Sequence, residues 1–316
     1  MAKKDLAYFK KRLARLAYYL KETIVLSLPC KPVDKFLSDV AASKQLKERV
    51  DYYCKLDQPF AVSKYAVSVC DFKRDKSFVY FADTKKVVRH FSKEKSFDFV
   101  FGDVTEVPNT PAFVKSRPIS GDNRNSVLLK LNAIRHYQFF EDNLSFNEKI
   151  KFAVWRGVVH QAHRRELVER FHNSDFADIG HNDLKRANSV KGFKGFMPVE
   201  EQLKYRYILS VEGYDVATNL KWAMASNSLV MMRKPRYETW FMEGRLEAGV
   251  HYVELKDDFS DLEEKITYFN QPEHLEEAQS IIANAQNYVQ TFFDAKQEKL
   301  LSLMVAKKYF DLQISR

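Results

Sequence analysis

Cysteine and long apolar runs are both scarce in this sequence. Its 316 residues include three cysteines, Cys30, Cys54 and Cys70, which are widely spaced and form no Cys-x-x-Cys pair. Their number and spacing exclude a disulfide framework and a zinc knuckle, and indicate reduced thiols. No run approaches the ~20 apolar residues that span a membrane, and residues 1–28 lack the apolar core of a signal peptide. We therefore expect a cytoplasmic protein that is soluble or peripheral on the inner membrane.

Glycine is also sparse, and the scattered positions of the glycines help to interpret one short motif that resembles a phosphotransfer site. The segment HNDLKRAN, from His181 to Asn188, has the pattern H-x-D-L-x-x-x-N, in which the aspartate accepts a proton and the asparagine binds a metal during phosphoryl transfer. That chemistry also requires a glycine-rich loop and an Asp-Phe-Gly segment. The nine glycines are scattered and the second segment is absent, so we interpret the match as coincidental. A phosphotransferase that uses ATP and Mg²⁺ stays open as an alternative.

The composition predicts a compact protein with a basic N-terminal region. Hydrophobic residues make up 45% of the chain and include 25 Phe and 16 Tyr, which argues against extended disorder. The formal net charge is 51 − 42 = +9, and residues 1–50 hold 12 basic and 5 acidic residues. Such a surplus attracts nucleic acid, anionic lipid or a phosphorylated glycolipid. A nucleic-acid-binding protein is a second alternative, but we expect no nucleic acid, because the surplus lies in a predicted helix rather than among aromatic-bearing strands.

Residues 5–21 are predicted to form a basic amphipathic helix. Its apolar stripe consists of Leu6, Phe9, Leu13, Leu16 and Leu20. Lysine and arginine side chains surround this stripe. Such a helix can lie on an anionic membrane surface or pack on its own domain with the lysines outward. We favour packing, because helices of globular proteins usually have this pattern.

The alternation of apolar segments predicts an α/β fold with two domains, since the chain is longer than most single cores. In the first half, strands are predicted at residues 60–69, 77–81 and 97–101, with a loop at 108–125. In the second half, strands are predicted at 152–155, 176–179, 207–211 and 251–255, and helices at 164–172, 198–205, 217–226, 261–270 and 273–310. We place an N-terminal α/β domain at residues 1–140 and a C-terminal Rossmann-like domain with a helical tail at residues 141–316.

The segment from Tyr207 to Met232 carries the strongest candidate site. A short apolar run stops at a polar turn, restarts as a helix and returns as a second apolar run, which predicts a β-turn-α-β unit. Ligands of open α/β sheets bind at the carboxyl ends of the strands, and helix N-termini there attract anions. We therefore predict that this turn binds a phosphorylated ligand. Its candidate residues are Glu212, Gly213, Asp215, Thr218, Asn219 and Lys221.

Two further segments place charged side chains at the ends of predicted strands. Arg156 and Gly157 follow one strand, and Arg164 lies at the start of the next helix. An arginine there can bind a diphosphate bidentately and offset charge on a leaving group, or it can be ordinary surface charge. Asp103 follows the strand that ends at Phe101. A carboxylate in that place can act as a general base toward an attacking hydroxyl, or it can cap a turn.

Several ordered motifs resemble one known family. WRGVVHQAHR at residues 155–164, KYRYILSVEGYDVATNLKWAMASNSLVM at 204–231, YETWF from Tyr237 and HYVEL from His251 are similar to segments of the lipopolysaccharide A protein glycosyltransferases. These bacterial enzymes belong to the family that also contains animal protein O-glucosyltransferases and fungal capsule-associated xylosyltransferases. The resemblance covers about residues 95–270 and rests on motifs that agree in order.

The resemblance implies a fold and a reaction. The fold is of the GT-B type, with two Rossmann-like domains facing a cleft, and the reaction is inverting, metal-independent transfer from UDP-glucose or UDP-galactose. No Asp-x-Asp metal motif occurs in the chain, and no cofactor is expected. The expected acceptor is a heptose of the lipopolysaccharide inner core, at the inner face of the cytoplasmic membrane. The donor turn departs from the animal enzymes, which carry Ser and Arg where this chain has Ala217 and Asn219.

The resemblance also assigns roles to the candidate residues. Asp103 falls where the eukaryotic members have their proposed base, so it is expected to take the proton of the acceptor hydroxyl. Arg156, Arg164 and Lys221 are expected to offset the charge on the leaving UDP, in place of a metal ion. The acidic residues of the donor turn are expected to hold sugar or ribose hydroxyls: Glu212 and Asp215.

Overall fold

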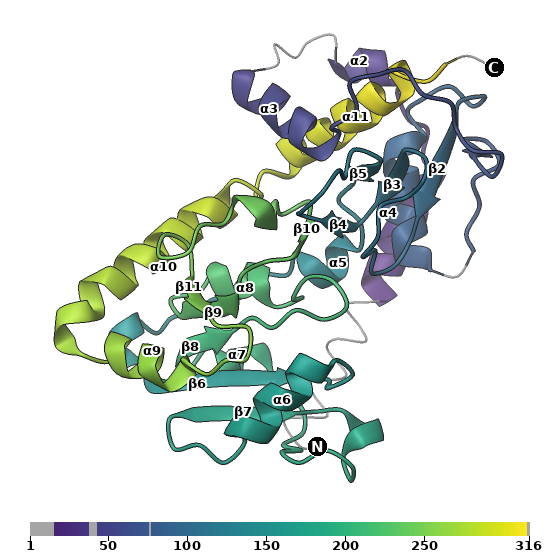
Figure 1. Ribbon diagram of the computed structural model, residues 1–316. Helices are drawn as coiled ribbons and strands as arrows, with labels where there is room; N and C mark the ends of the chain where they lie inside the picture. The colour runs from purple at the N-terminus through teal and green to yellow at the C-terminus, as the bar shows by residue number, and fades with distance from the viewer. Residues whose placement is uncertain (1–15, 38–42, 76, 315–316) are drawn as a thin grey trace. The chain divides into compact units, whose positions relative to one another are not determined.

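The chain folds into two compact units in the computed structural model, which describes residues 16–37, 43–75 and 77–314. Unit 1 contains residues 136–235 and 245–291, and unit 2 contains the described residues of 10–135, 236–244 and 292–316. Both units are mixed α/β structures with parallel strands, and the C-terminal region is helical, as predicted (Figure 1). Among the described helices, none has an apolar stretch of the length that a bilayer requires.

Unit 1 is built around a five-stranded parallel sheet. Its strands are β6 (Ile150–Gly157), β7 (Ala177–His181), β8 (Tyr205–Leu209), β9 (Leu229–Arg233) and β11 (Val253–Leu255), in the order β11-β9-β8-β6-β7. Its helices are α6 (Ala162–Phe171), α7 (Val199–Gln202), α8 (Leu220–Met224), α9 (Leu262–Phe269) and α10 (Leu275–Gln290), with short turns η1 (Phe146–Glu148), η2 (Leu184–Arg186) and η4 (Pro272–His274). Helices between successive strands allow those strands to run in parallel.

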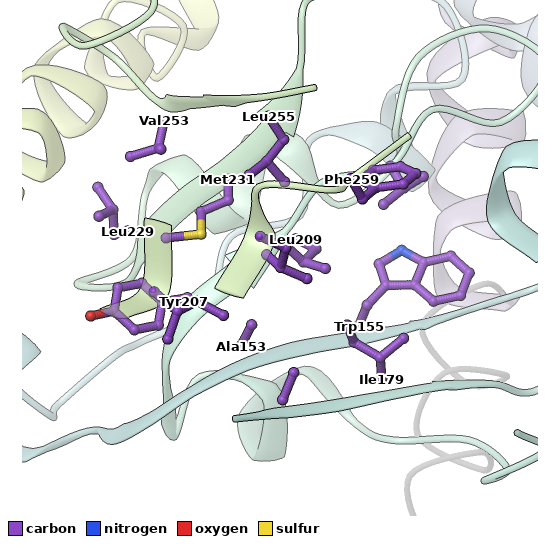
Figure 2. Packing of buried hydrophobic residues seen from close by; sticks show 14 of the residues in the cluster. Ala153, Trp155, Ile179, Tyr207, Leu209, Leu229, Met231, Val253, Leu255 and Phe259 are labelled. Atoms are coloured by element: carbon purple, nitrogen blue, oxygen red, sulfur yellow. The ribbon is translucent and has the colours of Figure 1, made fainter. Parts of the chain in front are cut away.

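Alternate residues of these strands form an apolar core on one face of the sheet. Figure 2 shows the cluster, with these labelled members: Ala153, Trp155, Ile179, Tyr207, Leu209, Leu229, Met231, Val253, Leu255 and Phe259. In the three central strands, the residues between them are also buried: Val154, Ile208 and Val230. Successive side chains of a strand point to opposite faces, so the centre of the sheet is covered on both faces. This explains why the strand sequences are nearly continuous apolar runs.

Unit 2 contains a four-stranded sheet and a two-stranded sheet. The first has the order β1 (Val67–Ser68), β2 (Ser96–Val100), β3 (Ala112–Val114) and β5 (Ser126–Leu128), with β1 antiparallel and the rest parallel. The second pairs β4 (Ser116–Pro118) with β10 (Tyr237–Thr239). Residues 16–27 are helical, followed by α2 (Val33–Leu37), α3 (Lys44–Tyr53), α4 (Phe78–Val88) and α11 (Ala295–Asp311). Two short helices, α5 (Ala133–His136) and η3 (Glu243–Arg245), lie where the chain passes between units.

Buried ion pairs join parts of unit 2 that are far apart in sequence. Nε of Arg117 in β4 donates to Glu238 in β10 at 2.7 Å, and both side chains are buried. Nη2 of Arg49 in α3 donates to Glu298 in α11 at 2.7 Å, and the indole of Trp240 donates to the same carboxylate at 2.6 Å. Loss of one partner would leave a buried charge uncompensated, which costs about 3–5 kcal/mol. The returning chain around β10 and α11 is therefore an integral part of unit 2.

The predicted alternation of strands and helices in the second half of the chain is confirmed, with small shifts at the element ends. The predicted helix at residues 273–310 is instead two helices, α10 and α11. The second begins anew because the Asp294 carboxylate accepts hydrogen bonds from the N–H groups of Lys296 and Gln297, at 2.9 and 3.1 Å.

Three predictions for the first half of the chain are wrong. Residues 77–81 are not a strand, since all but the first belong to α4. The segment has only four apolar residues, from Phe78 to Phe81, which are too few to distinguish the period of a helix from that of a strand. The polar part of α4 follows them. Of the predicted strand at 60–69, only Val67–Ser68 forms a ladder, as β1. The predicted loop at 108–125 contains two three-residue strands: β3, which follows Pro111, and β4, which ends at Pro118.

The N-terminal helix also differs from expectation. Its predicted residues Leu6, Phe9 and Leu13 lie outside the described part of the chain. Residues 16–27 are helical, but Leu16 and Leu20 are both more than half exposed. The described part of the helix packs on its own unit, as expected, but through Tyr18 and Tyr19 rather than through the predicted leucine stripe.

Candidate active site

The strand order of unit 1 creates a switch point between β6 and β8. From β6 the chain passes to β7 on one side, and then to β8, β9 and β11 on the other. Open parallel sheets bind ligands outside the carboxyl ends of the strands at such a point. The segments that follow Gly157 and Leu209 therefore form the candidate active site (Figure 1).

Arg164, in the first turn of α6, holds these two segments together. Its Nε donates to the carbonyl of Glu212 at 2.8 Å, and its Nη2 donates to the carbonyl of Val211 at 2.6 Å. Its Nη1 donates to the carbonyl of Val158 at 3.2 Å, and its guanidinium lies 5.6 Å from the ring centre of Trp155. One planar fork of donors thus connects the chain after β6 to the chain after β8.

Two glycines differ in how closely their neighbours approach. A Cβ on Gly157 would come within 2.5 Å of the buried indole of Trp155, so only glycine is accommodated without a shift of that ring. A Cβ on Gly213 would lie 3.4 Å from Nη2 of Arg164, which is close to an ordinary contact. The end of β6 is therefore the more tightly packed side of the switch point.

Arg156 takes part in an internal ion pair. Its Nη2 donates to Oδ1 of Asp178 in β7 at 2.7 Å, and its Nη1 donates to the Asp178 carbonyl at 2.7 Å. Lys194 and the hydroxyl of Tyr205 donate to the same carboxylate, each at 3.0 Å. Burial opposes ionisation of Asp178, but the hydrogen bonds and charges of Arg156 and Lys194 outweigh it and hold the pKa below its ordinary value. The predicted phosphate ligand Arg156 thus fastens the end of β6 to β7.

The predicted donor turn lies between the end of β8 and α8. Nδ2 of Asn219 donates to the carbonyl of Leu209 at 2.9 Å, and the hydroxyl of Ser210 donates to Oδ1 of Asn219 at 3.3 Å. Asn219 therefore ties the start of α8 back to the end of β8. Lys221 is fully buried in α8, and Thr218 is partly exposed. The turn is held by its own side chains as well as by Arg164.

Arg233 is a site residue that the sequence interpretation missed. It ends β9, and its Nη2 lies 3.8 Å from Oε2 of Glu212, with both side chains largely buried. Asp215, in the same turn, is also buried. Arg233 directly follows an apolar run, as Arg156 does, so the same signal could have identified it. The carboxyl ends of three neighbouring strands thus carry charged side chains.

A stacked pair of rings also went unpredicted. The imidazole of His160, after β6, stacks on the ring of Tyr214, after β8, with ring centres 4.6 Å apart and planes 28° apart. The Tyr214 side chain is mostly exposed. A sequence predicts a contact between aromatic residues only when their spacing is regular. These two residues belong to different loops, so their spacing does not predict the contact. The pair is a second link between the segments that Arg164 joins.

Asp103 lies in unit 2, just after β2. Gly102 before it has a φ of +116°, a conformation that favours glycine and turns the chain at the end of the strand. Nζ of Lys115 donates to Oδ1 of Asp103 at 2.5 Å, and the lysine side chain is 2% exposed while that of the aspartate is 34% exposed. The N–H of Val104 donates to the hydroxyl of Ser116 at 3.0 Å. A buried lysine thus fixes a carboxylate that remains accessible.

The segment from His181 to Asn188 has a local structural role. His181 is buried in β7, and the Asp183 carboxylate accepts from the N–H of Lys185 at 3.1 Å and from Arg186 at 2.8 Å. Burial would raise the pKa of Asp183, but Arg186 outweighs it and keeps that pKa below its ordinary value. A carboxylate with a lowered pKa is a weak proton acceptor. Both oxygens of the Asp183 carboxylate also accept hydrogen bonds within their own turn, which favours the interpretation that the phosphotransfer motif is coincidental.

The fold and the site define an α/β protein with charged side chains at the switch point of a parallel sheet, which is typical of enzymes that bind phosphorylated ligands. Residues 126–314 match glycosyl transferase family 90, and the chain belongs to this family. The protein is therefore a glycosyltransferase. The predicted family resemblance is confirmed, and the phosphotransferase and nucleic-acid-binding alternatives are set aside.

Individual relatives agree with this assignment. The chain is 50% identical to O-glucosyltransferase LpsA of Dichelobacter nodosus over 268 residues, which cover 84% of this chain and 83% of the relative. It is 27% identical to protein O-glucosyltransferase 2 of Danio rerio over 180 residues, 54% of this chain and 35% of the relative. It is also 27% identical to protein O-glucosyltransferase 3 of Homo sapiens over 177 residues, 54% of this chain and 34% of the relative.

The ion pair between β6 and β7 makes a testable contribution to stability. An ordinary aspartate has a pKa of about 3.9. Because the folded pKa of Asp178 is lower, its charge stabilises the fold above about pH 4, and this contribution is lost as the pH falls through the lowered pKa. In Asp178→Asn, we expect the free energy of unfolding at about pH 7 to fall by roughly 2 kcal/mol, the scale of hydrogen bonds to a charged group. Urea unfolding should also show that the stability of this variant decreases less as the pH is lowered.

The exposed Asp175 lies in the same unit and provides the control. Asp175→Asn should leave both the stability and its pH dependence unchanged. If Asp178→Asn were as stable as the unmodified protein across this pH range, Asp178 would have no role in holding the strand ends.

Proposed function

We propose that the protein transfers a hexose from a UDP-sugar to a heptose of the lipopolysaccharide inner core, with inversion at the anomeric carbon and without a metal ion. The match with O-glucosyltransferase LpsA, over 84% of the chain, carries this proposal. The name of that relative favours glucose, and UDP-galactose is the competing donor. The heptose acceptor and the nucleotide are expectations from the family resemblance. They imply a peripheral protein at the inner face of the cytoplasmic membrane.

We assign donor binding to unit 1 and acceptor binding to unit 2, as the two Rossmann-like domains of a GT-B enzyme. The switch point between β6 and β8 supports the first assignment, because nucleotides bind to parallel sheets at such points. The accessible carboxylate of Asp103 supports the second, because an acceptor hydroxyl needs a group that takes its proton. The predicted division near residue 140 is part of this proposal, except that residues 236–244 and 292–314 are assigned to the acceptor side with unit 2.

On the donor side, Arg164 is the proposed charge partner of the diphosphate. Its hydrogen bonds to three carbonyls fix its position, and hydrogen bonds to neutral acceptors do not cancel a positive charge. Lys221 is fully buried in α8, which directly follows the donor turn in sequence, and a charge there acts through a medium of low dielectric constant. Arg156 is assigned a positioning role through Asp178, since its donors bind that residue. Glu212 and Asp215 are the proposed partners of sugar or ribose hydroxyls.

In the proposed reaction, the acceptor oxygen forms a bond to the anomeric carbon while the bond from that carbon to the UDP oxygen breaks. The electron pair of the broken bond leaves with UDP. The acceptor proton passes to a carboxylate oxygen of Asp103, which Lys115 holds in place. Attack from the face opposite UDP inverts the anomeric configuration. Preorganised positive charge at the diphosphate lowers the barrier because it stabilises charge that develops in the transition state.

The proton acceptor is tested by Asp103→Asn. The amide keeps the shape of the carboxylate but accepts a proton poorly, so transfer should fall by about 10²–10⁴-fold. UDP affinity, measured by calorimetry, should not change. Asp57→Asn is the control, because Asp57 is an exposed aspartate of the same unit and should retain full activity. Turnover of Asp103→Asn within a few-fold of the unmodified enzyme would remove Asp103 from the mechanism.

The donor and the stereochemistry are tested on the product. The purified enzyme is incubated with UDP-glucose or UDP-galactose and a core-truncated lipopolysaccharide, with and without EDTA. We expect glucose to be transferred, the new linkage to have the β configuration by NMR since the donor is α-linked, and EDTA to have no effect. A retained α configuration, or loss of activity on chelation, would contradict the proposed inverting, metal-free transfer.

A further inference from the structure

The helix of residues 16–27 is held on unit 2 by one of its faces. The hydroxyl of Tyr18 donates to Asp83 of α4 at 3.1 Å, and Glu22 lies 3.1 Å from Nζ of Lys86 in the same helix. The ring of Tyr19 packs edge-on against Phe78 at the start of α4, with ring centres 5.1 Å apart. These contacts fix the rotation of the helix about its axis and decide which residues face away from α4.

The opposite face of this helix is apolar and exposed. Leu16, Leu20 and Ile24 are 51%, 67% and 60% exposed, and Leu28 just beyond the helix is 55% exposed. Residues four apart lie on one side of a helix, so the first three form a continuous stripe. Single exposed apolar residues are common on protein surfaces, but an aligned row indicates an interaction site.

Positive charge surrounds this stripe in the sequence. Residues 1–15 contain six Lys or Arg and one Asp, a surplus of 6 − 1 = 5. Within residues 16–37, the three basic residues Lys21, Lys31 and Lys35 are exposed. Of the two acidic residues, Glu22 is paired with Lys86 and Asp34 is exposed. A row of leucine and isoleucine bordered by basic residues matches an anionic lipid surface, into which the apolar side chains insert while the lysines contact the headgroups.

A second copy of this chain is a less suitable occupant. In a symmetric dimer the same patch meets itself, which would bring the basic borders of two copies together. Like charges opposed across an interface are unfavourable. The charge of the segment therefore favours a lipid surface over self-association.

We propose that Leu16, Leu20, Ile24 and Leu28 form a membrane-docking face that inserts into the interface of an anionic bilayer. This inference deepens the proposed function, since a lipopolysaccharide acceptor is anchored in a membrane. The face belongs to unit 2, the unit to which acceptor binding is assigned. It would place that unit against the bilayer that carries the acceptor.

The docking face is tested by flotation of the protein with two kinds of vesicle. One kind is pure phosphatidylcholine, and the other is an equimolar mixture of phosphatidylcholine and phosphatidylglycerol. We expect binding to the anionic vesicles, weakened by added salt. Leu20→Ser combined with Ile24→Ser should lower the partition coefficient by about tenfold or more. Leu184→Ser is the matched control, because Leu184 is an exposed leucine of unit 1 and should bind like the unmodified protein. Circular dichroism checks that all variants are folded.

Three results would overturn the docking face. The unmodified protein could fail to bind anionic vesicles, the double variant could bind them as well as the unmodified protein does, or sedimentation could show a dimer that the double variant abolishes while no vesicle binding is seen. Transfer to a soluble, deacylated core oligosaccharide separates this inference from the proposed function. The double variant should retain that activity, and a protein that binds vesicles but transfers no hexose would contradict the proposed function alone.

Discussion

The hydrogen bonds of the Arg164 guanidinium are the interaction on which the candidate active site depends. They reach the carbonyls of Val158, Val211 and Glu212, which belong to the two chain segments that leave the switch point. Carbonyl groups beyond the ends of strands have no partner in the sheet and need one elsewhere. The planar guanidinium of Arg164 donates hydrogen bonds to three such carbonyls and thereby sets the distance between the two segments. The same group also brings a positive charge to the place where a parallel sheet binds anionic ligands.

The last three residues of β6 show how closely this arrangement is specified. Trp155 packs in the core below Arg164, Arg156 reaches sideways to Asp178 of β7, and Gly157 leaves room for the indole. Successive side chains of a pleated strand point to opposite faces, so each of these residues contacts a different part of unit 1. A change at any of the three would disturb the position of Arg164, even without touching a substrate. The motif WRG is therefore explained by packing and hydrogen bonding as well as by the chemistry of the site.

The sequence predicts unit 1 much better than unit 2, for physical reasons. Strands covered on both faces are continuous apolar runs, and helices separate them, so the alternation from β6 to β11 can be recognised locally. Unit 2 uses three-residue strands and a pairing of β4 with β10 that is secured by Arg117 and Glu238, 121 positions apart. Such contacts leave no periodic signal. The ion-pair partners of individual charged residues could not be predicted from the sequence either. The register of β6 and β7 brings Arg156 to Asp178, and that register is set only when the sheet forms.

The central claim is that Arg164 organises the donor site, and calorimetric measurement of UDP affinity in Arg164→Lys tests it most directly. Lysine keeps the positive charge but lacks the planar guanidinium that donates to several carbonyls at once. The donor segments should therefore be held less well, and UDP affinity should fall by about tenfold or more. Arg165→Lys is the matched control, since Arg165 is the next residue of α6 and its hydrogen bonds to the carbonyls of His160 and Val159 are long, 3.3 and 3.4 Å. The account predicts weakened binding in the first variant and unchanged binding in the second, with both folded. Equal UDP affinity in Arg164→Lys and the unmodified protein would contradict it.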